Sequence, residues 1–300
     1  MNSFISWVGG KKALREEIYK RMPIKYERYI EVFGGGGWVL FGKKEDKFEV
    51  YNDMNSYLVN LFRCVKNRPI EFIKELNFLP LNSREEFNEI KKFLKKEEIK
   101  YEYMEEQLKI AKESLNEEDF EEILQLFNEE ILLDDVKKAV GFYKLIRYSY
   151  GSSVKSYGSN VVDIRKTFGT IWEANRRLKN TIIENKDFEA LIRHYDNESA
   201  FFYCDPPYYE TENYYQNIEF KEADHIRLKE TLAEIKGKFL LSYNDCEYIK
   251  NLYKDFYIEE ISRVNSMGLR YDNGIYKEVL ISNYNTKEKE IYKPEQIKLF

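Results

Sequence analysis

The residues best suited to chemistry in this 300-residue chain follow an apolar run at positions 200–204. The run is followed by an acid, two prolines and an aromatic residue: Asp205, Pro206, Pro207 and Tyr208. Each proline fixes its own φ angle and restricts the residue before it, so the pair holds the carboxylate and the phenol ring in a set geometry. Rigid positioning of this kind is typical of a catalytic site.

These residue types suit methylation of an exocyclic amine on a flat base such as adenine. The lone pair of adenine N6 is delocalised into the ring, which makes the nitrogen a poor nucleophile until it becomes more tetrahedral. The Asp205 carboxylate and the Pro206 carbonyl can accept the two amine hydrogens and favour that geometry. Tyr208 can stack on a base that has been flipped out of a duplex, where the target atom is otherwise inaccessible.

Four consecutive glycines, 34–37, form a second candidate site directly after a predicted strand at 29–33. Glycine is needed where a ligand leaves no room for a Cβ or where a turn demands a positive φ angle. About twenty residues further on, Asn52 and Asp53 end the next predicted strand, where an acid can accept hydrogen bonds from ribose hydroxyls. The two features together predict a nucleoside-binding site.

Strands that alternate with helices must position both sites, which indicates an α/β fold with a mostly parallel sheet. After the first strand, the predicted strands are 49–52, 181–184, 200–204, 238–242 and 257–262. Helices are predicted near residue 55 and at 225–235 and 247–253, and the segments 257–264 and 278–284 are expected to form an antiparallel hairpin. Residues 67–177 are charged and helix-prone, notably at 85–98 and 103–115, so they predict an inserted helical subdomain within a domain made of 1–66 and 178–300.

Composition narrows the class of protein further. The formal net charge of −5 counts against a simple nucleic-acid binder, yet acids concentrate at 102–135 while a basic stretch runs from Arg147 to Lys179. Three spaced cysteines and two histidines argue against a disulfide framework and a metal cluster. No apolar run is long enough to cross a bilayer, and no signal peptide is evident, so we expect a cytoplasmic protein.

The chain resembles the Dam-like DNA adenine N6-methyltransferases of the D12 class, α-group, over most of its length. The matching segments are the N-terminal run 4–11, the glycine segment 31–37, Asn52 with Asp53, the run 184–188, and the Asp-Pro-Pro-Tyr segment 205–208. The resemblance implies a Rossmann-like class I methyltransferase sheet, S-adenosylmethionine as methyl donor, S-adenosylhomocysteine as product, and no metal.

The resemblance also implies roles for individual residues. It makes Asp205, Pro206, Pro207 and Tyr208 catalytic, and it implies cofactor contacts for Trp7, Gly9, Lys11, Glu31, Phe33, Gly34, Gly36, Asp53, Asp187 and Phe188. Among these, Trp7 and Lys11 are expected near the methionine portion, Asp53 at the ribose, and Asp187 with Phe188 at the adenine of the cofactor. The helical insertion is expected to read DNA, with Arg147, Tyr148 and Lys155 as DNA-binding candidates.

These features favour a monomer that methylates adenine in double-stranded DNA in a bacterial or phage-infected cell, without membrane contact and with a restriction nuclease as a candidate functional partner. Two alternatives stay open. Methyltransferases of RNA adenine or of protein glutamine use a related motif, although Asp at position 205 and the N-terminal run favour DNA adenine. A DNA-binding relative that has lost catalysis is the other alternative, and it would show no turnover.

Overall fold

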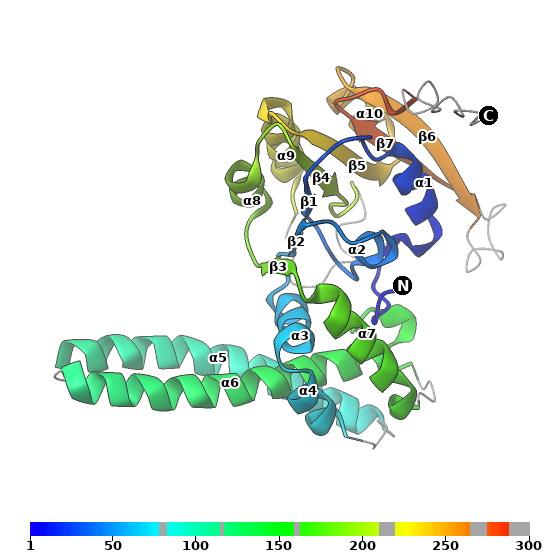
Figure 1. Cartoon of the computed structure of the whole chain (residues 1–300). Helices are drawn as coiled ribbons and strands as arrows, with labels where there is room; N and C mark the ends of the chain where they lie inside the picture. The colour runs from blue at the N-terminus through cyan, green and yellow to red at the C-terminus, as the bar shows by residue number, and fades with distance from the viewer. Residues whose placement is uncertain (78–82, 115–116, 159–162, 210–219, 265–274, 288–300) are drawn as a thin grey trace, which may run out of the picture. The chain divides into compact units, whose positions relative to one another are not determined.

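The computed structural model describes residues 1–77, 83–114, 117–158, 163–209, 220–264 and 275–287 (Figure 1). The chain divides into two compact units. The first comprises Met1–Ser3, Gly9–Asn55 and Asn180–Phe300, and the second comprises Phe4–Val8 and Ser56–Lys179. The two units are described separately below.

The first unit contains a seven-stranded sheet with the order β3-β2-β1-β4-β5-β7-β6. Its strands are β1 (Arg28–Glu31), β2 (Phe48–Asn52), β3 (Thr181–Glu184), β4 (Ala200–Cys204), β5 (Lys238–Asn244), β6 (Tyr257–Val264) and β7 (Ile275–Ser282). The first five strands pair in parallel, whereas β7 pairs antiparallel with both β5 and β6. The predicted α/β fold with a mostly parallel sheet and antiparallel C-terminal strands is therefore confirmed; the segment joining β6 to β7 lies outside the described residues.

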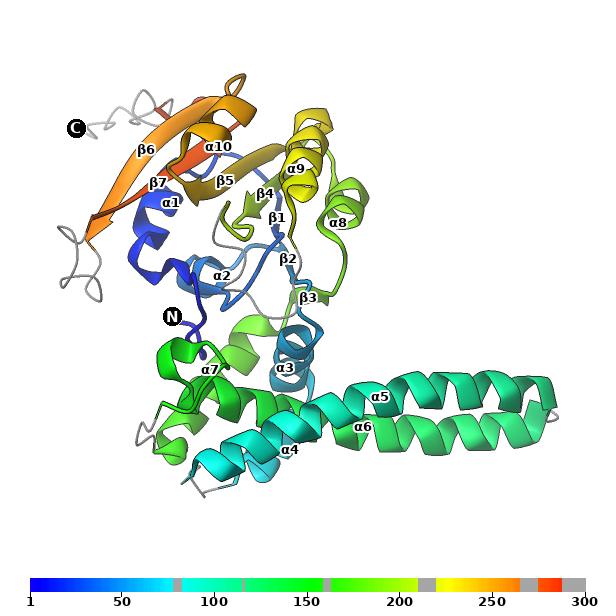
Figure 2. The same cartoon turned by 180° about the vertical axis from the view of Figure 1, so that it is seen from behind.

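Central strands of this sheet are apolar because helices cover both faces. All five residues of β4 are buried. The helices of the unit are η1 (Lys11–Ala13), α1 (Arg15–Arg21), α2 (Trp38–Gly42), α8 (Phe188–Tyr195), α9 (Glu222–Glu234) and α10 (Glu247–Leu252). Side chains from α8, α9 and α10 join the core cluster with residues of β1, β4 and β5, and Figure 2 shows α8 beside α9 from behind.

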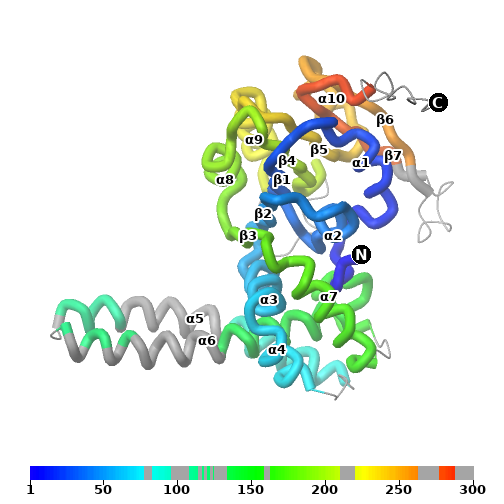
Figure 3. Tube along the Cα trace, in the orientation of Figure 1, coloured from blue at the N-terminus to red at the C-terminus, as the bar shows by residue number. Residues whose placement is uncertain are grey.

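The second unit is helical. It contains α3 (Ser56–Asn67), α4 (Pro69–Leu76), α5 (Arg84–Ser114), α6 (Glu117–Tyr148), η2 (Tyr150–Ser152), η3 (Ile164–Thr167) and α7 (Phe168–Leu178). The apolar residues of α3 that recur at helical spacing are buried, and this helix packs against α6 and α7. α5 and α6 pack against each other, and Figure 3 traces their coloured parts side by side.

Polar contacts tie α3 to its neighbours in this unit. The Asn60 side chain donates a hydrogen bond to the Asp135 carbonyl of α6, and Asn175 of α7 donates to the Lys66 carbonyl. The helix 56–67, which the sequence groups with the sheet, thus packs within the helical unit. Within the described part of the chain, no helix combines the length and hydropathy that a membrane span requires.

Candidate functional site

Parallel pairing brings the two predicted sites to one edge of the sheet. Arg28 to Glu31 of β1 pair with Ala200 to Tyr203 of β4, so both strands end at the same level. The glycine turn follows β1, and Asp205 follows β4. In sheets of this kind, ligands bind beyond the carboxyl ends of the strands.

The glycine turn is held close to β2. A Cβ built on Gly34 would lie 2.2 Å from a ring carbon of Tyr51, and the Gly34 amide donates to the Asn52 carbonyl at 2.7 Å. Gly35 and Gly37 have φ angles of 50° and 66°, which residues other than glycine rarely adopt. The hydroxyl of Ser3 donates to the Gly36 carbonyl. The turn therefore requires glycine for both space and backbone conformation.

Asp53 is anchored beneath this turn by backbone amides. Its carboxylate accepts hydrogen bonds from the Gly35 amide at 2.8 Å and from the Asn55 amide at 2.8 Å. Burial raises the pKa of Asp53 to about 6, while the two amides oppose that shift. The predicted ribose-binding acid and the glycine turn are thus joined directly.

Glu31 and Phe33 flank the start of the turn. Glu31 is buried, and its carboxylate accepts a hydrogen bond from the Tyr29 hydroxyl at 2.7 Å. Burial raises the pKa of Glu31 to about 8, so this carboxyl is mostly protonated at neutral pH. The ring of Phe33 contacts the rings of Phe188 and Phe220, with centroids 5.7 and 5.9 Å away. An aromatic wall therefore stands beside the glycine turn.

Asp187 begins the helix that contributes Phe188 to this wall. Its carboxylate caps α8 by accepting from the Glu189 and Ala190 amides. It also binds Arg227 through both oxygens, at 2.8 and 2.9 Å. The Arg227 guanidinium lies 4.0 Å from the Phe188 ring centroid. Asp187 thereby fixes the position of Phe188, and Arg227 is a supporting residue that the sequence did not predict.

Asp205 lies at the end of β4 beside a cation. Its carboxylate is 2.7 Å from the Lys11 ammonium, and both side chains are largely buried. The Ser242 hydroxyl donates to the same carboxylate at 3.4 Å. Burial raises the pKa of Asp205 to about 6, Lys11 opposes that shift, and the nearby Glu278 adds to it.

Tyr208 lies beside the same pair of charges. Its hydroxyl donates to the Glu278 carboxylate at 2.6 Å, and the Lys11 ammonium lies 4.7 Å from its ring centroid. Pro206 and Pro207, between Asp205 and Tyr208, are both buried. Glu278 and Ser242 were not among the predicted site residues; an acid opening a predicted apolar strand was the signal that could have revealed Glu278.

The N-terminal run contributes to both units. Gly9 adopts a φ of 75°, and its carbonyl accepts a hydrogen bond from the Lys11 ammonium at 3.1 Å, which places both in the first unit. Trp7 belongs to the second unit, where its ring lies 5.9 Å from that of Phe142. The predicted residues Gly9 and Lys11 thus adjoin Asp205 within one unit.

The three predicted DNA-binding residues lie at the end of α6 and in the loop after it, all in the second unit. Arg147 donates hydrogen bonds to the Tyr143 hydroxyl and the Phe4 carbonyl, both at 3.1 Å. Tyr148 is fully buried, and its carbonyl accepts from the Gly158 amide at 2.7 Å. Lys155 is exposed. Among the described residues, no group of three or more potential His, Cys, Asp or Glu ligands is arranged to hold a metal.

Sheet order, glycine turn and the Asp-Pro-Pro-Tyr segment at one edge together define a Rossmann-like methyltransferase. Residues 7–267 match the family model of the D12 class N6 adenine-specific DNA methyltransferases, and the chain belongs to this family. It is accordingly a site-specific DNA adenine methyltransferase.

Curated relatives extend this similarity over nearly the whole chain. The type II methyltransferase M.MjaIII of Methanocaldococcus jannaschii is 30% identical over 94% of this chain and 98% of its own length. M1.LlaDCHI of Lactococcus lactis subsp. cremoris, also named a type II methyltransferase, is 27% identical over 95% of this chain and 96% of its own. The DNA adenine methylase of Escherichia coli is 32% identical over 29% of this chain and 34% of its own length.

Proposed function

We propose that the enzyme transfers a methyl group from S-adenosylmethionine to N6 of an adenine flipped out of double-stranded DNA, with Asp205 and Tyr208 as catalytic residues. The observation that carries this proposal is the edge shared by the glycine turn and the Asp-Pro-Pro-Tyr segment. A nucleoside bound at the turn and a base held by Asp205 would then meet at one place, which is the requirement of a direct transfer.

The residues around the glycine turn fit a nucleoside cofactor. Gly34 lets the turn lie against the Tyr51 ring, and Asp53 presents a buried carboxylate beside the turn, where it can accept from ribose hydroxyls. S-adenosylmethionine supplies an electrophilic methyl group on a sulfonium. We assign the ribose to Asp53, the adenine to the wall formed by Phe33 and Phe188 and oriented by Asp187, and the remaining contacts to Gly9, Lys11, Glu31, Gly34 and Gly36.

The target amine would be held by acceptors at the end of β4. The Asp205 carboxylate accepts one N6 hydrogen and the Pro206 carbonyl the other, which draws the nitrogen towards tetrahedral geometry. Pro207 helps to fix this segment, and Tyr208 offers its ring face to the flipped base. Because Lys11 lies 2.7 Å from the Asp205 carboxylate, the amine must share or replace that ion pair when it enters.

DNA contacts of the helical unit are assigned to Arg147, Tyr148 and Lys155. Lys155 is exposed and can reach phosphate, whereas the buried Tyr148 supports the loop through its carbonyl. The name type II methyltransferase, carried by two full-length relatives, supports a role in restriction and modification with a partner nuclease. We propose a cytoplasmic monomer that needs no metal.

Transfer of labelled methyl from S-adenosylmethionine to duplex DNA, followed by mapping of the modified adenines, tests this function. Label on adenine in a fixed sequence context is expected, and Asp205→Ala should abolish it while calorimetry still detects cofactor binding. An active Asp205→Ala enzyme would refute the catalytic assignment. Label on RNA or on protein glutamine, but not on DNA, would support the alternative substrates.

A further inference from the structure

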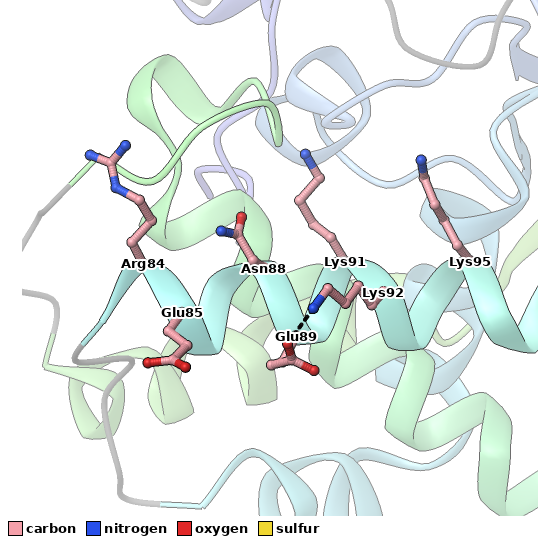
Figure 4. A pocket seen from close by; sticks show the side chains of 7 residues that line it. All are labelled: Arg84, Glu85, Asn88, Glu89, Lys91, Lys92 and Lys95. Carbon is pink, nitrogen blue, oxygen red and sulfur yellow. Dashed lines mark hydrogen bonds and ion pairs between the residues drawn. The ribbon is translucent and has the colours of Figure 1, made fainter.

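A row of cations lies along the first three turns of α5, in the second unit. Arg84, Asn88, Lys91 and Lys95 are spaced by four, three and four residues, which puts them on one face of an α-helix. Figure 4 shows their side chains projecting to the same side of α5, away from Glu85 and Glu89. They line a groove of about 620 Å³, to which Glu85, Glu89 and Lys92 also contribute, so its lining carries four cations and two acids.

Of the two acids that line the groove, Glu89 pairs with a lysine outside the row. Lys92, around the helix from the row, pairs with Glu89 at 2.7 Å. Within the part of the chain that the structure describes, Arg84, Lys91 and Lys95 form no ion pair with a carboxylate. Arg84 and Lys95 are exposed, and Lys91 is half-buried. The row thus presents three positive charges and one amide to an outside ligand.

A hydrogen bond joins this row to the loop after α6. The Lys91 ammonium donates to the backbone carbonyl of Lys155 at 3.1 Å, which places the backbone of this exposed lysine against the row. That loop is rigidly built: Val154 adopts a φ of 61°, a rare conformation for a β-branched residue, and its amide donates to the Ser149 hydroxyl. The row and the backbone at Lys155 therefore lie side by side.

We propose that this surface binds the phosphate backbone of the DNA that flanks the target site. At 1.5 Å per residue, the eleven-residue separation of Arg84 and Lys95 spans roughly 16 Å of helix axis. One strand of a duplex carries a phosphate per roughly 3.4 Å, so the row matches about five phosphates. The amide of Asn88 adds a neutral donor that phosphate oxygens accept.

The proposal rests on DNA being the substrate, and it extends the contact beyond Arg147, Tyr148 and Lys155. It predicts affinity without sequence preference, because phosphate contacts carry no direct sequence information. A duplex of arbitrary sequence is therefore a sufficient probe, even before the target site is mapped.

Two matched variants of the full-length protein test it. Lys91→Gln/Lys95→Gln removes two charges from the row, and Lys109→Gln/Lys112→Gln removes two exposed charges of α5 that do not line the groove. Fluorescence anisotropy with a labelled 30-base-pair duplex gives Kd across a salt series. Each phosphate contact contributes about 0.9 to the negative slope of log K against log salt concentration. Removing two contacts should therefore make the slope of the first variant shallower by about 1.8. A change in slope of this size corresponds to roughly thirtyfold weaker DNA binding by the variant than by the wild type near 0.15 M salt.

The control pair should bind like the wild type, and Lys91→Arg/Lys95→Arg should restore both the slope and the affinity. Equal losses in the two glutamine variants would overturn the proposal, since they would reflect net charge alone. Unchanged DNA binding in the first variant would also overturn it. Methyl transfer by the wild type is measured in parallel: its absence would count against the proposed function, whereas transfer with unaltered slopes would reject only this surface.

Discussion

Replacing Lys11 by methionine should shift the pH dependence of methyl transfer without abolishing it. In the proposed mechanism, Asp205 accepts an amine hydrogen as a carboxylate, and its pKa is about 6 because burial raises it while Lys11 opposes the rise. An opposite charge at this range lowers a carboxyl pKa by about one to three units. Methionine keeps the length of the side chain and removes the charge 2.7 Å from the carboxylate.

The size of the effect follows from the ionised fraction. With a pKa of about 6, roughly 97% of Asp205 is ionised near pH 7.5; with the pKa raised by about two units, roughly 24% is. The variant should therefore lose about fourfold in kcat/KM near pH 7.5 and recover that loss near pH 9.5, before any additional effect on cofactor binding.

The assay is kcat/KM for DNA between about pH 5 and 10, since this parameter reports pKa values of the free enzyme. Lys12→Met is the matched control, because Lys12 is exposed and its ammonium lies over the Trp38 ring, 5.4 Å from the centroid. Glu278→Gln should move the acid limb to lower pH, because Glu278 raises the Asp205 pKa. An acid limb that stays near pH 6 in an active Lys11→Met enzyme would refute the role of Lys11.

Three further changes test the cofactor side of the site. Asp53→Asn should weaken S-adenosylmethionine binding by about tenfold to a hundredfold, the range for a hydrogen bond to a charged group, and unchanged calorimetric affinity would remove Asp53 from the ribose. Gly34→Ala should lower both the melting temperature and cofactor affinity, because its Cβ would lie 2.2 Å from the Tyr51 ring. Normal binding and stability would show that the turn can shift to accommodate the added methyl group. Glu31 has a folded pKa of about 8 against an ordinary 4.5, so the folded state holds its proton and stability falls as pH rises from about 4.5 to 8. Glu31→Gln should flatten this fall by a few kcal/mol in chemical denaturation, and an equally steep pH dependence would contradict the buried, protonated carboxyl.

Local patterns in the sequence located most of the sheet. The predicted strands 181–184 and 200–204 coincide with β3 and β4. β4 is buried throughout, and such a strand is a short apolar run with clear ends. β3 was located equally well although it lies at the edge of the sheet and exposes Ile182. β5 continues to Asn244, two residues beyond the prediction. Its end pairs with Glu278 of β7, and that antiparallel partner is not visible in the local sequence.

The helical segment shows the same limit. Residues 85–98 and 103–115 were predicted as helix-prone, and the structure has one helix, Arg84–Ser114, which contains no glycine or proline that would end it. Local sequence thus favours a helix throughout this range, whereas its packing against α6 depends on a partner that local propensity does not reveal.

Side chains that approach from distant elements were the hardest part of the site to predict. Asp205 and Tyr208 are separated only by Pro206 and Pro207, and these two prolines encode the rigid geometry of the segment. Glu278, however, reaches Tyr208 across 70 residues of sequence, and Arg227 reaches Asp187 across 40. Such pairs depend on sheet order and helix packing, so a single sequence reveals the acid but not its partner.

The pairing of Asp205 with Lys11 also bears on how the enzyme selects its base. A buried carboxylate is costly without a partner, and Lys11 with Ser242 provides partners in the absence of DNA. A base with an exocyclic amine can donate a hydrogen bond to the Asp205 carboxylate in place of one of these partners. A base with a carbonyl at that position would instead place an acceptor oxygen against the acceptor oxygens of Asp205. A base without an amine would leave the Asp205–Lys11 ion pair in place and gain no hydrogen bond from the carboxylate, which favours bases that carry an amine. The same ion pair that keeps Asp205 ionised would then help to exclude bases that have no amine to donate.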